Sequence, residues 1–267
     1  MSKQRLDTLL VDRQLCDSRQ QAQRLIRAGE VRVNQQVIDK PGTEVDVQAQ
    51  IQVKQRSPFV SRGGEKLAQA LNTFAIPVAD RICLDGGIST GGFTDCLLQA
   101  GAKRVYGVDV GYGQVDWKLR NDPRVILKER TNLRYLQPEQ LYPEGEPYAN
   151  LGVVDVSFIS LTKILPALTL LLAEPKEVVL LVKPQFEVGR DRVGKGVVRD
   201  PQAQIAAIAQ VLNAALDSGW YYRGLVASPL LGPAGNREFL LWLDHISQTP
   251  APDLSTLAEV VEQPRET

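Results

Sequence analysis

Four charged residues occupy positions where they could act together on a hydroxyl group. Lys66 precedes the first predicted strand of the larger part of the chain, Asp155 and Lys183 each end a later strand, and Glu238 opens the last one. A neutral lysine can remove a hydroxyl proton if burial or neighbouring cations lower its pKa from about 10.4 toward about 7–8. A carboxylate can orient that lysine. A single lysine at a strand end is usually a solvated surface residue, so the ordering of all four is the signal.

A dense glycine turn follows the first of these strands, Ile82–Asp85, and leads into a helix. Glycine lets the backbone approach a ligand closely, and open α/β sheets bind ligands at the carboxyl ends of their strands. Asp109 ends the next strand, where it could accept hydrogen bonds from two ribose hydroxyls. The alternative is that the glycines only build a tight turn. The predicted cofactor contacts in and before the turn are Asp85, Gly86, Gly87, Ser89, Thr90, Gly91, Gly92 and Phe93.

The spacing of the turn distinguishes two possible cofactors. A dinucleotide fold would show G-x-G-x-x-G, with a pyrophosphate at the helix N-terminus. Here the spacing is Gly-Gly-x-x-x-Gly-Gly, and the Asp85 carboxylate stands immediately before it. A carboxylate would repel a pyrophosphate but suits the cationic methionine end of S-adenosylmethionine. We therefore predict that the turn binds S-adenosylmethionine.

Strands alternate with helices from residue 82 onward, which predicts a doubly wound parallel sheet. The last two strands follow one another without a helix, so one of them is expected to run antiparallel at the sheet edge. The polar segment Ser247–Thr267 is expected to be a mobile tail. The predicted strands are 82–85, 105–110, 125–128, 151–156, 178–182, 221–227 and 239–244, and the predicted helices are 92–100, 114–121, 161–172 and 202–217.

The first part of the chain differs from the rest in charge. Residues 1–57 carry a net charge of +3 and the remainder −3, in a chain whose total is zero. Residues 3–14 put Leu6, Leu9 and Leu10 on one helical face, and a second helix, capped by Ser18, is expected to bury Ala22, Leu25 and Ile26. Short strands follow, and this module is expected to bind a polyanion. The alternative is an ordinary solvated helix face. The predicted RNA-phosphate contacts are Arg5, Arg13, Arg19, Arg24 and Arg27.

Two resemblances extend these predictions. Residues 5–53 closely resemble the RNA-binding domain first described in small-subunit ribosomal protein S-four, through Ser18–Arg19, Leu25–Ile26, Gly29 and Val33–Asn34. Residues 60–245 resemble the FtsJ-like ribose methyltransferase domain, and both parts together resemble the TlyA family (hemolysin A, rRNA 2′-O-methyltransferase). That resemblance maps the family's Lys-Asp-Lys-Glu tetrad onto Lys66, Asp155, Lys183 and Glu238. It implies that Lys183 is the base, although the two lysines could be exchanged.

The same resemblance implies further properties. Asn132 would contact the adenine of the methyl donor, the basic loop Glu187–Arg199 would be a lid over RNA or a merely disordered surface loop, and cytidines of ribosomal RNA would be the acceptors. The implied fold is a Rossmann-like seven-stranded methyltransferase sheet with a small N-terminal α+β RNA-binding domain. The expected divisions are an RNA-binding domain at 1–56, a linker at 57–62, a methyltransferase domain at 63–247 and the tail at 248–267.

Composition excludes several other classes. Cys16, Cys83 and Cys96 form no C-x-x-C pair, which favours a reduced cytoplasmic protein. The lone His245 lies in an apolar segment and is expected to be structural, so no metal cluster built on several His and Cys residues is expected. The most apolar run, Ile164–Ala173, is too short to span a bilayer. We expect ribosomal RNA or ribosomal subunits as partners, and no membrane and no stable protein partner.

Three rival functions remain open from the residues. A membrane-damaging hemolysin lacks support, because no spanning segment or long amphipathic basic helix is evident. A non-catalytic ribosome-binding factor would not need the full tetrad. A metal-dependent small-molecule O-methyltransferase could use Asp155 and Glu238 as ligands but would not need the RNA-binding module.

Overall fold

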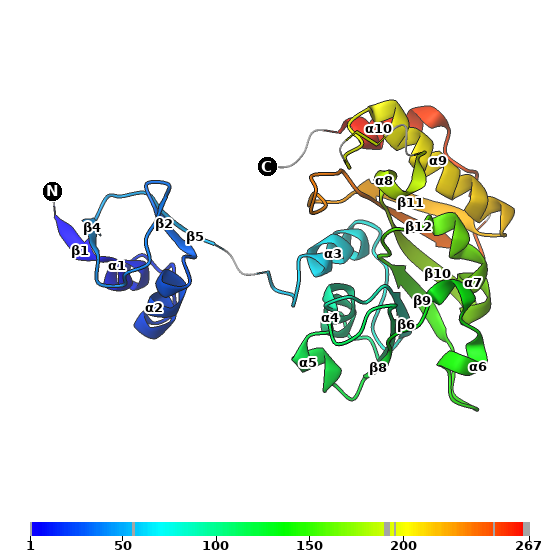
Figure 1. Cartoon of the computed structure of the whole chain (residues 1–267), viewed down its shortest axis with the longest axis horizontal. Helices are drawn as coiled ribbons and strands as arrows, with labels where there is room; N and C mark the ends of the chain where they lie inside the picture. Colours follow the sequence, from blue (N-terminus) through cyan, green and yellow to red (C-terminus); the bar gives the residue numbers. More distant parts are fainter. Residues whose placement is uncertain (1, 55–56, 190–192, 195, 248, 264–267) are drawn as a thin grey trace. The chain divides into compact units, whose positions relative to one another are not determined.

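The computed structural model describes residues 2–54, 57–189, 193–194, 196–247 and 249–263. The chain divides into two compact units, Met1–Arg56 and Ser57–Thr267 (Figure 1). Each unit has its own hydrophobic core, as expected of segments that fold as separate domains. No helix in the described part of the chain is both long enough and apolar enough to cross a membrane.

The N-terminal unit packs two helices against two small antiparallel sheets, β1–β4 and β3–β2–β5. Leu6, Leu10, Ala22 and Ile26 are fully buried on the helix faces that the spacing predicted. Ser18 caps the second helix by accepting a hydrogen bond from Gln21 N at 3.3 Å, also as predicted. The elements are β1 (Lys3–Arg5), α1 (Leu6–Asp12), α2 (Arg19–Arg27), β2 (Val31–Val33), β3 (Gln36–Val37), β4 (Glu44–Asp46) and β5 (Ile51–Val53).

The first helix begins three residues later than the predicted range 3–14. The polar segment Lys3–Arg5 has no apolar side chain to bury on a helix face, and it pairs instead with Glu44–Asp46 as a short antiparallel strand. Arg5 has extended backbone angles and directly precedes α1.

The second unit is a mixed seven-stranded sheet with helices on both faces. Its first half contains α3 (Gly63–Thr73), β6 (Ile82–Gly86), α4 (Gly92–Gln99), β7 (Arg104–Val108), α5 (Trp117–Arg120), β8 (Val125–Lys128), the 3₁₀ turn η1 (Leu133–Tyr135), α6 (Pro138–Leu141) and β9 (Ala149–Val154). The rest contains η2 (Leu161–Lys163), α7 (Leu165–Leu171), β10 (Leu172–Val182), α8 (Pro184–Glu187), α9 (Pro201–Asp217), β11 (Tyr221–Ala227), β12 (Phe239–Asp244) and α10 (Leu254–Glu262).

The strand order is β11-β12-β10-β9-β6-β7-β8. All strand pairs from β10 to β8 are parallel, while β12 runs antiparallel to both β10 and β11. Side chains that alternate along each strand therefore enter two different cores. Leu84 and Val154 face the core under α7, α9 and α10, whereas Cys83 and Val153 face the core under α3, α4 and α5. The predicted seven-stranded sheet is confirmed.

The position of the antiparallel strand differs from the prediction. It was expected at the sheet edge, but β12 lies between β10 and β11, and β11 forms the edge. Burial explains the difference. The sequence Phe239–Asp244 is almost entirely buried, as an internal strand must be, whereas β11 has only partly buried residues around Leu225.

The C-terminal segment also differs from the prediction. The mobile tail expected at 248–267 is wrong for residues 254–262, which form α10 and pack against α9 and β11. Leu257 and Val261 are buried in the main core, and Asp253 caps the helix by accepting from Thr256 N at 2.8 Å. The polar composition concealed two apolar positions at helical spacing, i and i+4.

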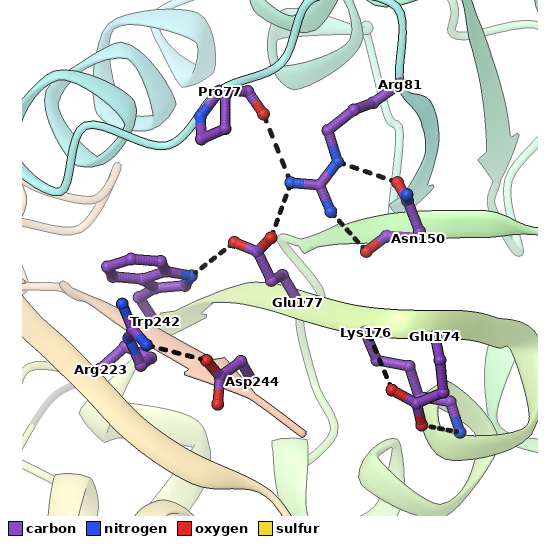
Figure 2. Close-up of polar contacts among 9 residues, drawn as sticks. All are labelled: Pro77, Arg81, Asn150, Glu174, Lys176, Glu177, Arg223, Trp242 and Asp244. Atoms are coloured by element: carbon purple, nitrogen blue, oxygen red, sulfur yellow. Dashed lines mark hydrogen bonds and ion pairs between the residues drawn. The ribbon is translucent and has the colours of Figure 1, made fainter. Parts of the chain in front are cut away.

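A polar network fastens the amino ends of the central strands (Figure 2). Arg81 donates to both the side-chain oxygen and the backbone carbonyl of Asn150, at 2.9 and 2.7 Å, and forms an ion pair with Glu177 at 2.9 Å. Trp242 Nε1 donates to the other oxygen of Glu177 at 3.2 Å. This network connects β6, β9, β10 and β12 at the end of the sheet opposite the glycine turn.

Candidate active site

The glycine turn brings two strand ends into close contact. Gly87 has a φ of +87°, and a Cβ there would lie 2.4 Å from the carbonyl oxygen of Asp155, so no other residue fits without displacing backbone. Gly91 has a φ of +98°, and a Cβ there would lie 2.3 Å from Leu119 Cδ1. The glycines therefore do build a tight turn, and they also place the β6 loop directly against the end of β9.

Asp85 lies beneath this turn with no solvent exposure. Thr94 Oγ1 donates to Asp85 Oδ2 at 2.6 Å, while Asp85 Oδ1 has no hydrogen-bond partner among the described residues. Burial raises the pKa of the Asp85 carboxyl to about 7, and the Thr94 hydrogen bond opposes that rise. A buried carboxylate oxygen without a partner costs free energy, so a cation or donor from a ligand would be favourable here.

A cavity of about 510 Å³ lies beside the turn, within the size range of small-molecule sites. Asp109 and Asn132 both line it, as do Gly87 and Ser89 of the turn. Each oxygen of Asp109 accepts one backbone N–H, from Ser89 at 2.8 Å and from Gly111 at 2.7 Å. These bonds hold the carboxylate at the cavity wall, and each oxygen retains a second lone pair for a ribose hydroxyl.

Asn132 has a structural role besides facing the cavity. Its side-chain oxygen caps η1 by accepting from Arg134 N at 3.0 Å, which leaves the amide NH₂ as the group available to a ligand. The unpartnered Asp85 oxygen, the Gly87 cradle and this polar wall fit S-adenosylmethionine.

A second, smaller cavity of about 210 Å³ adjoins the first through residues that line both, Gly87, Ser89 and Asp155. Thr90, Gly92 and Phe93 of the predicted cofactor set line this cavity, whereas Asp85, Gly86 and Gly91 line neither one. Its opposite wall contains Lys66 and the N-terminal end of α3. The larger cavity could hold the methyl donor and the smaller one the acceptor, and the Asp155 carboxylate lies on the wall that the two cavities share.

The four predicted catalytic residues form two ion pairs. Lys183 Nζ lies 2.5 Å from Asp155 Oδ1, and Lys66 Nζ lies 2.5 Å from Glu238 Oε2. Lys66, Lys183 and Glu238 are buried, whereas Asp155 is partly exposed. Removing one partner of such a buried pair would leave an uncompensated charge, which is costly. Each acid also holds its lysine in place through the ion pair.

The sheet topology explains how these residues meet. β9 and β10 are parallel neighbours, so Asp155 and Lys183 follow adjacent strand ends. Because β12 is antiparallel, its first residue lies opposite the last residue of β10, with Phe239 paired to Val182. Glu238 therefore opens β12 at the same edge at which Lys183 ends β10.

Sequence reasoning missed three residues of this edge. Ser157 accepts a hydrogen bond from Lys183 Nζ at 3.0 Å. Phe158 is 91% exposed with a φ of +64°, an unusual conformation for a non-glycine residue. Glu187, at the end of α8, is buried. No periodic pattern or apolar run in the sequence marks Ser157, Phe158 or Glu187.

The predicted RNA-contacting arginines fall into three groups. Arg24 and Arg27 are exposed on α2. Arg5 and Arg19 are about half exposed and both form ion pairs, at 3.0 Å, with the fully buried carboxylate of Asp7.

Arg13 is differently placed, because its guanidinium donates to the backbone carbonyls of Val47 and Ala49 within the unit. The Arg5 guanidinium is the largest influence on the Asp7 carboxyl and holds its pKa well below its usual range.

Three further predictions concern His245, metal-ligating side chains and the predicted lid. His245 packs edge-on against Trp220, with ring centroids 4.4 Å apart, and its Nδ1 lies 3.4 Å from Glu174, which is consistent with a structural role. No group of three metal-ligating side chains occurs among the described residues. Of the predicted lid 187–199, residues 190–192 and 195 lie outside the described residues. The described part includes the buried Val198, whose backbone N donates to Asn236 Oδ1 at 2.9 Å.

The sheet order, the antiparallel β12 and the glycine turn that follows the acidic end of β6 define the class of S-adenosylmethionine-dependent methyltransferases. The chain matches the FtsJ-like methyltransferase family over residues 59–245 and the S4 domain over residues 4–51. With both parts present, the chain belongs to the TlyA family.

Individual relatives agree with this assignment. The chain is 50% identical to the 16S/23S rRNA (cytidine-2′-O)-methyltransferase TlyA of Mycobacterium tuberculosis, over 90% of this chain and 89% of the relative. It is 40% identical to Hemolysin A of Brachyspira hyodysenteriae, over 88% and 98%. A solved structure of a candidate hemolysin from Streptococcus thermophilus superimposes with a TM-score of 0.74 at 43% identity, covering 98% of this chain and 95% of the other.

Proposed function

We propose that this protein transfers the methyl group of S-adenosylmethionine to the ribose 2′-hydroxyl of cytidines in ribosomal RNA. The observation that carries the proposal is the Lys183–Asp155 ion pair of 2.5 Å. Asp155 lines both cavities, and Lys183 lies behind it, outside the lining of either one. The chemistry of this pair suits a hydroxyl acceptor, which must lose a proton as the new carbon–oxygen bond forms. The names of the relatives supply the RNA and the cytidine.

The cofactor supplies an activated methyl group on a sulfonium centre. Around it, Asp85 acts from beneath the turn as the counter-charge, Asp109 accepts from the ribose of the donor, and Asn132 offers its amide to the adenine. Gly87, Ser89 and Asp155 line both cavities, so donor and acceptor would meet where the two cavities adjoin. Such alignment lowers the barrier to in-line transfer.

Lys183 takes the proton of the 2′-hydroxyl in this proposal. The Asp155 carboxylate, 2.5 Å from Nζ, stabilises the ammonium that the proton transfer produces. Ser157, 3.0 Å from Nζ, limits the directions in which the lysine can point. Lys66 lines the acceptor cavity itself and holds the ribose or phosphate, while Glu238 fixes Lys66.

The N-terminal unit supplies RNA affinity in this proposal. Arg24 and Arg27 offer exposed charges on α2, and Arg5 and Arg19 are held at the surface by Asp7. Contacts of this kind bind phosphates without regard to sequence. We place the protein in the cytoplasm, where ribosomal RNA is the available polyanion of this kind.

The deciding experiment incubates the protein with labelled S-adenosylmethionine and hypomodified ribosomal subunits or free ribosomal RNA, and then maps the label. Label on a cytidine ribose oxygen is the expected result. Label on a nucleobase would overturn the mechanism, and label on a protein or a small molecule would overturn the substrate. Lys183→Ala is expected to abolish labelling, and Lys66→Ala to raise the KM for RNA, which separates the roles of the two lysines.

A further inference from the structure

Glu187 is a buried carboxylate that the proposed reaction does not use. Its side chain is the last of α8 and only 6% of the residue is exposed. Ser160 Oγ donates to Glu187 Oε2 at 2.6 Å, and Leu161 N donates to Glu187 Oε1 at 2.9 Å. Burial raises the pKa of this carboxyl, and the two hydrogen bonds oppose the rise. An acid kept in such a place needs an explanation, because its burial is costly.

The contact between Glu187 and Ser160 joins the two chain segments that carry the reacting pair, Lys183 and Asp155. On one side, α8 begins at Pro184, immediately after Lys183, and Glu187 is its fourth residue. On the other side, Ser160 ends the short segment that starts at Asp155 and includes Ser157. The ion pair and the Ser157 bond at Lys183 form one connection between these segments, and the Glu187 carboxylate forms a second.

The rest of the surroundings holds both ends still. Gln210 Nε2 of α9 donates to the backbone carbonyl of Glu187 at 3.1 Å, so the end of α8 is attached to the long helix behind it. Ser160 also caps η2 by accepting from Thr162 N at 3.2 Å. The carboxylate thus joins two segments that are each already anchored. Cross-links of this kind orient reactive groups that they do not touch.

We propose that Glu187 is a positioning residue, whose carboxylate fastens segment 157–161 to the turn after Lys183 and so sets how Lys183 faces Asp155 and Ser157. The proposal rests on the proposed function, because it assigns Lys183 and Asp155 as the reacting pair. Both oxygens of the Glu187 carboxylate already accept hydrogen bonds from Ser160 and Leu161, so we expect it to bind neither donor nor acceptor. Its effect is therefore expected on the rate of transfer and not on binding.

Two variants of Glu187 test the cross-link. In Glu187→Gln the amide oxygen can accept from Leu161 N, and the amide NH₂ can donate to Ser160 Oγ, so both contacts survive without the charge. This variant is expected to keep kcat within about threefold of the wild type, since the geometry is preserved. Glu187→Ala removes both contacts and is expected to lower kcat about 10- to 100-fold, the usual range for such supporting groups, with an unchanged Kd for S-adenosylmethionine.

A matched variant separates positioning from loss of stability. Glu177 lies on β10 and also accepts two hydrogen bonds, from Arg81 and Trp242, but at the opposite end of the sheet. Glu177→Ala is expected to lower the melting temperature while the kcat per folded molecule stays near wild type. Ser160→Ala removes only one bond to Glu187 and is expected to give an intermediate kcat, which keeps the test valid if Glu187→Ala does not fold.

Several outcomes would overturn the proposal. Wild-type kcat in Glu187→Ala and Ser160→Ala would show that the cross-link does not position the pair. Equal loss of kcat in Glu187→Gln and Glu187→Ala would assign the effect to charge, and equal loss in Glu177→Ala would assign it to stability. A wild-type rate in Lys183→Ala would instead refute the proposed function, so the two failures are distinguishable.

Discussion

Carboxylates at the two ends of the central sheet differ in how completely they are hydrogen-bonded. At the amino end, Arg81 and Glu177 meet four other groups, and each oxygen of Glu177 accepts a hydrogen bond (Figure 2). At the carboxyl end, Asp85 and Glu238 each retain one buried oxygen without a hydrogen-bond partner in the described structure. Among the described residues, the Glu177 carboxylate is therefore fully hydrogen-bonded, whereas the Asp85 and Glu238 carboxylates at the other end are not.

Backbone conformation does not follow this division, because non-glycine residues with positive φ occur at both ends: Ser89 and Phe158 at the carboxyl end, and Asp80 just before β6 at the amino end. Such residues cost free energy and persist where the surrounding structure holds them. The difference between the ends therefore lies in hydrogen bonding: the Arg81–Glu177 network stabilises the fold, while the carboxyl end keeps, in the described part of the chain, unpaired carboxylate oxygens that a ligand can satisfy. Removing polar groups from the two ends should therefore have different consequences.

The largest expected effect comes from comparing two lysines at opposite ends of β10. Lys183→Ala removes the proposed base and is expected to lower kcat about 1,000-fold or more, because a positioned base contributes about 10²–10⁴. Lys176→Ala, at the amino end, removes a hydrogen bond to the Thr169 carbonyl and is expected to change kcat less than twofold. Single-turnover methyl transfer measures both. Similar losses in the two variants would contradict the division between the ends.

The next effect concerns stability. Arg81→Ala would leave Glu177 and Asn150 without their main partner in a largely buried position, with an expected loss of about 3 kcal/mol in the free energy of unfolding. Methyl transfer per folded molecule should remain near the wild-type rate. Urea denaturation followed by fluorescence provides the measurement. An Arg81→Ala protein of full stability, or a folded but inactive one, would contradict the comparison.

A pH dependence sharpens the comparison at the cofactor site. The pKa of Asp85 is about 7 in the ligand-free protein, and a cationic ligand favours the ionised carboxylate. The affinity for S-adenosylmethionine should therefore increase as pH rises from 6 to 8, by about tenfold for one linked proton. Isothermal titration calorimetry at several pH values tests this. Asp85→Asn should bind more weakly and without that slope, and an unchanged slope would exclude Asp85 as its source.

The smallest expected effect is on the stability of the ligand-free protein. Because burial raises the pKa of Asp85 from 3.8 to about 7, the folded state holds a proton that the unfolded chain releases between these values. Stability from this group is present below about pH 4 and is lost as pH rises through about 7, by about 1 kcal/mol between pH 6 and 7. The wild type should lose stability relative to Asp85→Asn across this interval, as chemical denaturation would show. Parallel curves would contradict the assignment.

Much of this fold could be predicted from the sequence because its signals are local. The strands at 125–128, 221–227 and 239–244 have the predicted bounds, since apolar runs between turn residues mark them. The insertion of β12 between β10 and β11 could not be predicted, because strand order depends on pairing between distant segments. The helix α10 was missed because its apolar positions, Leu254, Leu257, Ala258 and Val261, stand in a short segment between polar, proline-containing stretches, and the composition of the whole stretch favoured a tail.

The candidate site divides in the same way. The strand-end positions of Asp155, Lys183 and Glu238 follow from the strand pattern, and the structure brings them to one edge. The pairing of each lysine with a particular acid could not be predicted, because it depends on side-chain directions across β10 and α3. Glu187 acts through contacts with Ser160 and Leu161, which lie 26 or more positions away, so nothing in its local sequence indicates a role.

The ion pair between Lys66 and Glu238 joins residues 172 positions apart in the chain. Its consequence appears during synthesis. At about 5–20 residues per second, Lys66 leaves the peptidyl-transferase centre about 10–30 s before Glu238 is added. A growing chain therefore cannot assemble this half of the site until Glu238 has been added.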